Sequence, residues 1–277
     1  MKSKRGLTVG RRVKLGGVGR ASFYRFDEGD SPRADRDLDL RDAIQRVALQ
    51  WPSYGRPRIT AELRRQGWRV GPNRVRRIMR EDNLLCVRRR NFVVTTDSRH
   101  NLPIYPNLAC QMIPTVINEL WVADITYIRL RTEFVYLAVV LDAFSRRVVG
   151  WALGRTLETK LALAALRMAF IQRLPKPGLV HHSDRGVQYA SGDYTGMLQQ
   201  HKATISMSRK GNPYDNAACE SFMKTLKHEE VYRNEYRDFH DAHASIGEFL
   251  ERVYNQKRLH SALGYLPPAE FENGGKS

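Results

Sequence analysis

Three acidic residues stand in contexts that suit metal-ion chemistry. Asp124 interrupts an apolar run at 121–127 (WVADITY), where a carboxylate is costly unless it is paired or binds a cation. Asp184 follows a short apolar segment at 179–183, and ligands of α/β proteins lie at such strand ends. Glu220 falls in a predicted helix. Mg²⁺ prefers oxygen ligands, and two ions about 3.5–4 Å apart stabilise both reacting oxygens of a phosphoryl displacement. The three carboxylates therefore form a candidate two-magnesium site.

Each of these acids also has an ordinary structural interpretation, because a lone carboxylate is more often a cap, a turn residue or a salt-bridge partner. Asp215 is suited to cap the helix that carries Glu220, and Asp142 ends a predicted strand, where we interpret it as structural. His181 and His182 lack a cysteine or a third histidine at suitable spacing, which disfavours a zinc site.

The elements that must position these acids begin near residue 119. Three β-rich runs, a strongly apolar helix and two further strand–helix alternations predict the order βββαβαβαα. The predicted strands lie at 120–130, 134–144, 147–153, 179–183 and 203–208, and the predicted helices at 161–174, 191–201, 215–231 and 238–255. This order belongs to the mixed α/β class, with a five-stranded sheet and flanking helices in a domain at 113–277.

An all-α region precedes this domain. Apolar spacing predicts helices at 38–50, at 58–66 and from Pro72 onward. In the third helix an apolar stripe faces one way and arginines face elsewhere, as a groove-entering helix requires. These arginines, and the run that follows, are Arg74, Arg76, Arg77, Arg80, Arg88, Arg89 and Arg90. We predict a helix-turn-helix DNA-binding domain at 38–90; the alternative is a plain helical bundle with solvated arginines.

The remaining segments are a basic N-terminal stretch and a linker. Residues 1–37 combine a short helix-turn-helix-like element with an acidic linker, and residues 91–112 lack helical periodicity. Residues 1–100 hold 25 Lys+Arg against 11 Asp+Glu, whereas residues 101–277 hold 21 against 18. Most of the net charge of +17 therefore lies in the first third, which indicates a nucleic-acid-binding part joined to a nearly neutral one.

Composition excludes several other classes of protein. The longest apolar run, 135–141, is far shorter than the roughly 20 residues of a membrane-spanning helix, and the N-terminus is basic rather than signal-like. Cys86, Cys110 and Cys219 are widely separated, which disfavours a disulfide framework. These features fit a cytoplasmic protein without a membrane partner.

Longer motifs resemble those of one family. The segments WVADITY at 121–127, HSDRGVQY at 182–189 and GNPYDN at 211–216 resemble the integrase-type catalytic core of insertion-sequence transposases. The closest likeness is to the second-reading-frame product of the two-frame bacterial family, whose full transposase arises by frameshifting. YNQKRLHSALGY at 254–265 and PAEF at 268–271 resemble its C-terminal signature, and SYG at 53–55 with RRIM at 76–79 resembles its helix-turn-helix domain.

This resemblance implies an RNase H-like fold and a nucleoid-associated enzyme that cleaves 3′ ends of an element and transfers them to target DNA. It implies Asp124, Asp184 and Glu220 as catalytic and metal-binding residues, with two Mg²⁺ (or Mn²⁺) ions. Water and then a DNA 3′-hydroxyl serve as nucleophiles. Lys224 and Lys227 follow Glu220 along one helix face and are expected to hold DNA phosphates. A homo-oligomer on double-stranded DNA, with the first-reading-frame product as fusion or partner, is also implied.

The chain departs from the family pattern at two points. Arg56-Pro57 replaces an expected Tyr- or Cys-Arg pair, which puts the turn before the second helix in doubt, and Cys219 is an unusual neighbour for Glu220. No leucine-zipper heptad is present, so the chain resembles the catalytic frame alone. Two rival functions stay open: a catalytically silent DNA-binding regulator of the element, and a structure-selective nuclease on the same fold.

Overall fold

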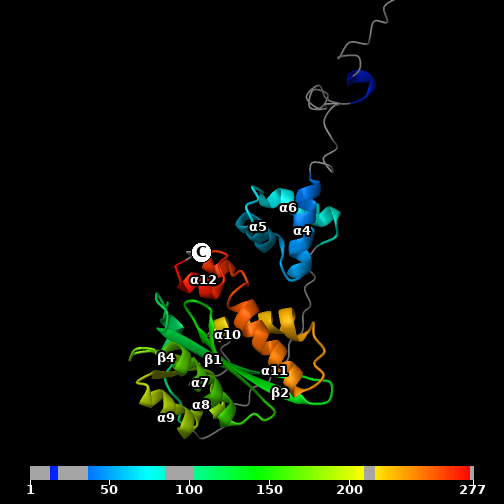
Figure 1. Ribbon diagram of the computed structural model, residues 1–277. Helices are drawn as coiled ribbons and strands as arrows, with labels where there is room; N and C mark the ends of the chain where they lie inside the picture. Colours follow the sequence, from blue (N-terminus) through cyan, green and yellow to red (C-terminus); the bar gives the residue numbers. More distant parts are fainter. Residues whose placement is uncertain (1–12, 18–36, 85–102, 209–215, 275–277) are drawn as a thin grey trace, which may run out of the picture.

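A computed structural model describes residues 13–17, 37–84, 103–208 and 216–274. A unit of three helices stands over a larger unit built on a β-sheet (Figure 1). Most of the basic N-terminal stretch lies outside the described residues, as do Arg88, Arg89 and Arg90. No helix in the described ranges combines the length and apolar character needed to cross a membrane.

A five-stranded sheet forms the larger unit, in the order β3-β2-β1-β4-β5. The strands are β1 (Leu120–Arg129), β2 (Phe134–Asp142), β3 (Val148–Gly154), β4 (Val180–Ser183) and β5 (Thr204–Met207). The first three form an antiparallel meander, and β4 and β5 run parallel to β1. Asp124 therefore lies in the central strand, next to the strand that ends just before Asp184.

Helices cover both faces of the sheet. One face packs against α7 (Thr159–Arg173), α8 (Val187–Ala190) and α9 (Gly192–Gln200), and the other packs against α10 (Ala217–Leu226) and α11 (Phe239–Glu248). Alternate residues of β1 divide between the two cores: Trp121 joins the α7 side, whereas Leu120 and Val122 join the α10 side. This sheet order with helices on both faces is the RNase H-like fold, so the predicted fold class is confirmed.

The two C-terminal helices differ in geometry from the prediction. The helix predicted at 215–231 is α-helical only to Leu226 and continues as a π-helical turn, Lys227–Val231. Likewise α11 passes into the π-helical segment Phe249–Tyr254. Four short helices do not follow from the sequence pattern, because each is only three to five residues long: Ala109–Gln111, α8, Ser261–Leu263 and α12 (Pro268–Glu272).

The smaller unit consists of α4 (Leu38–Gln50), α5 (Arg56–Arg65) and α6 (Pro72–Glu81) around one apolar cluster. Pro57 lies in the first turn of α5, where the missing N–H is not needed by the helix. The Arg56-Pro57 departure therefore leaves α5 intact, and the helix begins two residues earlier than predicted.

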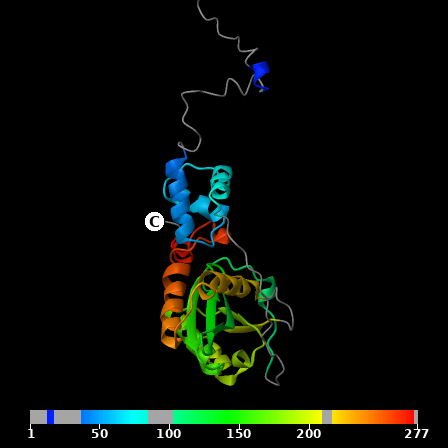
Figure 2. The same ribbon diagram turned by 90° about the vertical axis from the view of Figure 1, so that its right-hand side faces the viewer.

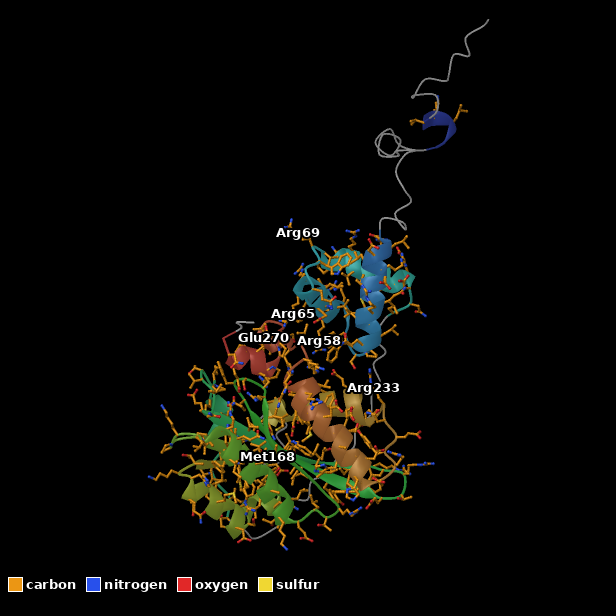
Figure 3. All side chains as sticks on the ribbon, in the orientation of Figure 1. Arg58, Arg65, Arg69, Met168, Arg233 and Glu270 are labelled. Carbon is orange, nitrogen blue, oxygen red and sulfur yellow. The ribbon has the colours of Figure 1, made fainter. Side chains whose placement is uncertain are left out.

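The C-terminal segment joins the two units (Figure 2). Leu259 is buried in the apolar cluster of the three helices, although it follows the second unit in sequence. Its backbone oxygen accepts a hydrogen bond from Arg58 Nε at 3.1 Å. Figure 3 shows Arg58, Arg65, Arg233 and Glu270 at this junction. The helical unit is thus held against the larger unit by packing and by hydrogen bonds.

Candidate active site

The parallel pairing of β1 with β4 brings Asp124 and Asp184 level with each other. Leu120 pairs with Val180 and Val122 with His182, so the same offset, continued by two residues, sets Asp184 opposite Asp124. Both acids follow the parity of Leu120 and Val122, whose side chains face α10. They line one cavity of about 240 Å³.

The surroundings of Asp124 disfavour its negative charge. Burial, together with repulsion from Asp184 and Glu220, raises the pKa of Asp124 to about 7, against the hydrogen bond that its Oδ1 accepts from Ile125 N. Asp184 is oriented by its own loop, because Asp184 Oδ1 accepts a hydrogen bond from Gly186 N at 2.9 Å. A Cβ at Gly186 would lie 3.0 Å from that oxygen and would crowd the Asp184 carboxylate. An oxygen-only pair whose charge is this unfavourable suits a bound divalent cation.

Glu220 reaches this region from α10. Its neighbour Cys219 is fully buried in the core between α10 and the sheet, and burial raises the pKa of that thiol well above its usual value. Glu220 itself forms an ion pair with Lys224 at 3.5 Å, and its charge acts on Asp124, but it does not line the cavity of the two aspartates. Within the described ranges, no three His, Cys, Asp or Glu side chains are grouped so as to hold one ion.

Lys227 points toward the strand that carries Asp124. Its Nζ lies 5.0 Å from the ring centroid of Tyr127, a cation–π contact. Burial lowers the pKa of Lys227, and the nearby charge of Asp124 opposes that shift. The two predicted lysines therefore differ: Lys227 is half-buried beside the aspartates, whereas Lys224 is exposed and paired with Glu220.

Three residues of the aspartate cavity are not among the predicted site residues: Tyr127, Tyr136 and Gln188. Tyr127 and Tyr136 are directly opposite each other on β1 and β2. Period-two alternation along β1 places Tyr127 in the strand, but not at the cavity. Gln188 belongs to the HSDRGVQY segment, so the motif carries a signal for it.

His181 and His182 are core residues. Both are fully buried; His181 Nε2 lies 3.1 Å from Tyr194 Oη, and His182 Nδ1 lies 2.8 Å from Ser206 Oγ. Burial lowers the pKa of His181 to about 3, so its imidazole stays neutral. These contacts engage one ring nitrogen of each histidine inside the core.

The predicted DNA-contacting arginines of α6 fall into two groups. Arg74 and Arg77 both donate to the carboxylate of Asp37, which is 3% exposed. Arg76 and Arg80 are exposed on the outer side of the helix. Asp37 thus neutralises part of the positive charge of the arginines that we predict to contact DNA.

Comparison with known proteins shows which domain families this sequence matches. The sequence matches the integrase core domain over residues 115–213 and again over 201–268, and an HTH-like domain over residues 34–92. It is 39% identical to the 31 kDa protein of insertion element IS600 from Shigella sonnei, over 92% of this chain and 95% of that protein. Identity to the transposase InsF of insertion sequence IS3A from Escherichia coli is 38%, over 79% of this chain and 77% of that one.

A third relative and a solved structure complete the comparison. The transposase of insertion sequence element IS904 from Lactococcus lactis is 39% identical over 79% of this chain and 87% of that protein. The HTLV-2 integrase catalytic core domain, solved in complex with magnesium, gives a TM-score of 0.45 at 15% identity, over 57% of this chain and 98% of that one. That structural likeness is too weak to bear on function.

Proposed function

Since this chain belongs to the insertion-sequence transposases that carry an integrase core, we propose that it cleaves the 3′ ends of its element and joins them to target DNA. The observation that carries the proposal is the pair Asp124, on β1, and Asp184, directly after the parallel strand β4, which lie level with each other and line one cavity. Asp124, Asp184 and Glu220 are the residues that would hold two divalent ions, Mg²⁺ or Mn²⁺. The metal fits the donor chemistry, because all the candidate ligands are carboxylate oxygens and the charge of Asp124 is unfavourable without a cation.

When bound, the ions supply Lewis-acid stabilisation of the attacking and leaving oxygens of phosphoryl transfer. The chain's own groups supply position and charge. Gly186 N holds Asp184, and Lys227 stands beside Asp124, where its ammonium is suited to bind a DNA phosphate. Cys219 is buried and stays protonated, so it is no nucleophile for this reaction. Water in the cleavage step and the DNA 3′-hydroxyl in the joining step fill that role.

Glu220 must turn away from its present partner to join the two aspartates. It lies at the side of α10 and is held by Lys224, which is four residues further along the helix. An exposed i,i+4 pair of this kind is weak and is readily exchanged for a stronger partner. We infer that Glu220 leaves Lys224 and turns toward Asp124 when cations bind.

The helical unit supplies DNA binding, as an HTH-like domain next to an integrase core implies. On α6, the exposed side chains Arg76 and Arg80 would contact DNA directly. Arg74 and Arg77 are paired with Asp37, so any DNA that they contact would also lie near this carboxylate. An element has two ends, and we propose a homo-oligomer on DNA in which each active site serves one of them. The first-reading-frame product, as fusion or partner, would complete end recognition, and the reaction would take place at the bacterial nucleoid.

Equilibrium binding of Mn²⁺ tests the metal assignment without relying on activity. Titration calorimetry on the whole chain should show Mn²⁺ binding that Asp124→Asn and Asp184→Asn each weaken by about ten-fold or more. The matched control is Asp193→Asn, an exposed carboxylate in the first turn of α9, which should leave binding unchanged. Equal binding by all four proteins would refute the assignment.

A further inference from the structure

A second cavity, of about 410 Å³, lies at the junction of the two units and carries positive charge. It is bounded by the N-terminal half of β1, one side of α10 and the C-terminal segment. Arg58 from α5, Arg146 from the β2–β3 turn and Arg258 all line it. We call it the arginine cavity. Its lining among the described residues contains no aspartate or glutamate.

Among the described residues, an acidic partner is found for one of the three guanidinium groups. Arg258 donates to both carboxylate oxygens of Glu229, each at 2.7 Å. Within the described parts of the chain, no carboxylate lies in ion-pair distance of Arg58 or Arg146. Arg58 donates to the backbone oxygen of Leu259 and lies over the ring of Tyr54, 5.6 Å from its centroid. The charge of all three is felt at His260, whose pKa is lowered to about 3 by burial and by these arginines. Counted over the described residues, the cavity therefore holds more positive than negative charge.

The backbone presents Arg146 to the cavity in an uncommon conformation. Its φ is +61°, in the left-handed region that a non-glycine residue rarely adopts. The turn is held by Asp142, whose Oδ1 accepts hydrogen bonds from Phe144 N and Ser145 N. The turn thus fixes the backbone of Arg146 at the edge of the cavity, and no acidic partner for its guanidinium lies among the described residues.

The rest of the lining suits a phosphate. Asn216, Ala217 and Ala218 form the N-terminal end of α10, where backbone N–H groups favour an anion. Ser221, one turn along the same side, adds a hydroxyl group, whereas the hydroxyl of Thr225 donates to the backbone oxygen of Ser221. A guanidinium fork matches two phosphate oxygens better than an ammonium does.

The arginine cavity is connected to the aspartates through β1 and α10. Val122 lines the arginine cavity and lies two residues before Asp124 on the same side of β1. Asn216, at its edge, donates from Nδ2 to the backbone oxygen of Ala123 at 3.2 Å. On α10, Ser221 faces the arginine cavity, and Glu220 lies on the adjacent row. One helix thus separates the carboxylates from the arginines.

We propose that the arginine cavity binds a phosphate group of a DNA strand, with Arg58 and Arg146 as its ligands, so that the strand crosses α10 between this site and the carboxylates. The proposal rests on the proposed function, which brings DNA to this face. Because Arg58 belongs to the helix-turn-helix unit, one bound phosphate is held by both units at once, and DNA binding strengthens their junction. An acidic segment of a partner protein is the competing occupant.

Fluorescence anisotropy of a labelled element-end duplex, measured over a range of salt concentrations, tests the proposal. Arg146→Asn removes the charge, and asparagine tolerates the left-handed backbone, so the fold should be kept. We expect about a ten-fold loss of DNA affinity at low salt and a salt slope that is smaller by about 1. The control, Arg167→Gln on the exposed side of α7 beyond the opposite sheet face, removes the same charge and should change neither.

A second pair of variants avoids touching an arginine. Ser221→Asp places negative charge in the cavity and should weaken DNA binding, whereas the neutral Ser221→Asn should not. Wild-type affinity and slope in both Arg146→Asn and Ser221→Asp would overturn the proposal. So would a loss of affinity for a glutamate-rich peptide with DNA binding unchanged, which would favour the protein partner.

The two proposals fail in different ways. If Arg146→Asn has a reduced salt slope, and the wild-type chain binds DNA but never cleaves it, the phosphate site is supported and the proposed function is contradicted. Cleavage by the wild-type chain, with no effect of either Arg146→Asn or Ser221→Asp on DNA binding, supports the function and overturns the phosphate site. A wild-type chain that does not bind DNA at all overturns both.

Discussion

The phenol oxygen of Tyr54 accepts a hydrogen bond from the backbone N–H of Leu259 at 2.8 Å, across 205 residues of sequence. Both residues are buried, and burial raises the pKa of Tyr54 to about 12, so the phenol stays protonated. Nearby, Arg65 forms two hydrogen bonds with the carboxylate of Glu270, at 3.0 and 2.7 Å. The SYG and RLH segments are thus parts of one contact, which fixes the DNA-binding unit against the catalytic unit.

The contact predicts the effect of Tyr54→Phe. Phenylalanine keeps the ring but leaves the buried Leu259 N–H without an acceptor, which costs about 1–3 kcal/mol. The free energy of unfolding, from urea titrations, should fall by that amount. Tyr232→Phe, at a side chain that is 52% exposed, should change it by less than about 0.5 kcal/mol. Equal stability of the two variants would show that the hydrogen bond contributes nothing.

This contact also marks the limit of what the sequence predicts. The five strands and the main helices follow from apolar periodicity, which is local, and Asp124 and Asp184 stand out because acids interrupt or end apolar runs. The hydrogen bond between Tyr54 and Leu259 joins two distant segments, and the local sequence pattern of either segment does not predict contact with the other. The same holds for Arg58 and Arg146, which share a cavity only in the folded chain. Asp37 ends a segment whose composition predicts a linker, yet it is the buried partner of Arg74 and Arg77.

Replacement of glycine by alanine should have opposite effects on stability at two positions. At Gly150 a Cβ would lie 2.1 Å from the backbone oxygen of Ala165, so Gly150→Ala forces α7 away from β3. We expect a loss of about 3 kcal/mol or more, as for severe overpacking. Gly196, inside α9, has no atom within 4 Å of its would-be Cβ, and Gly196→Ala should stabilise by about 0.5–1 kcal/mol. Thermal unfolding should show a lower melting temperature for Gly150→Ala and a higher one for Gly196→Ala than for the wild type. A Gly150→Ala variant as stable as the wild type would contradict the close packing of α7 on β3.

Acid should weaken the helix-turn-helix unit through Asp37. Burial alone would raise its pKa, but hydrogen bonds from Arg77 and Arg74 outweigh this and hold the pKa of Asp37 below its usual value. A lowered carboxyl pKa gives stability that is present above the unfolded-state pKa, about 3.9, and is lost as pH falls through the folded-state pKa. The melting temperature of the wild-type chain should therefore drop below about pH 4.

The matched variant for this prediction is Asp37→Asn, which has no carboxylate to titrate. It should melt at a lower temperature than the wild type at neutral pH, and the difference between the two should shrink in acid. A difference that stays constant from neutral pH to about pH 2 would show that the Asp37 contacts do not depend on its charge.

The most direct measurement of the central claim is strand cleavage and joining on DNA that carries the ends of the element encoding this chain, with Mg²⁺ present. The wild-type chain should release 3′ ends and join them to target DNA. Asp124→Asn, Asp184→Asn and Glu220→Gln should each lose at least about a thousand-fold in rate while binding DNA as before, and Asp193→Asn should match the wild type. Full cleavage by Asp184→Asn would contradict the account, and DNA binding without cleavage by the wild-type chain would favour a silent regulator of the element.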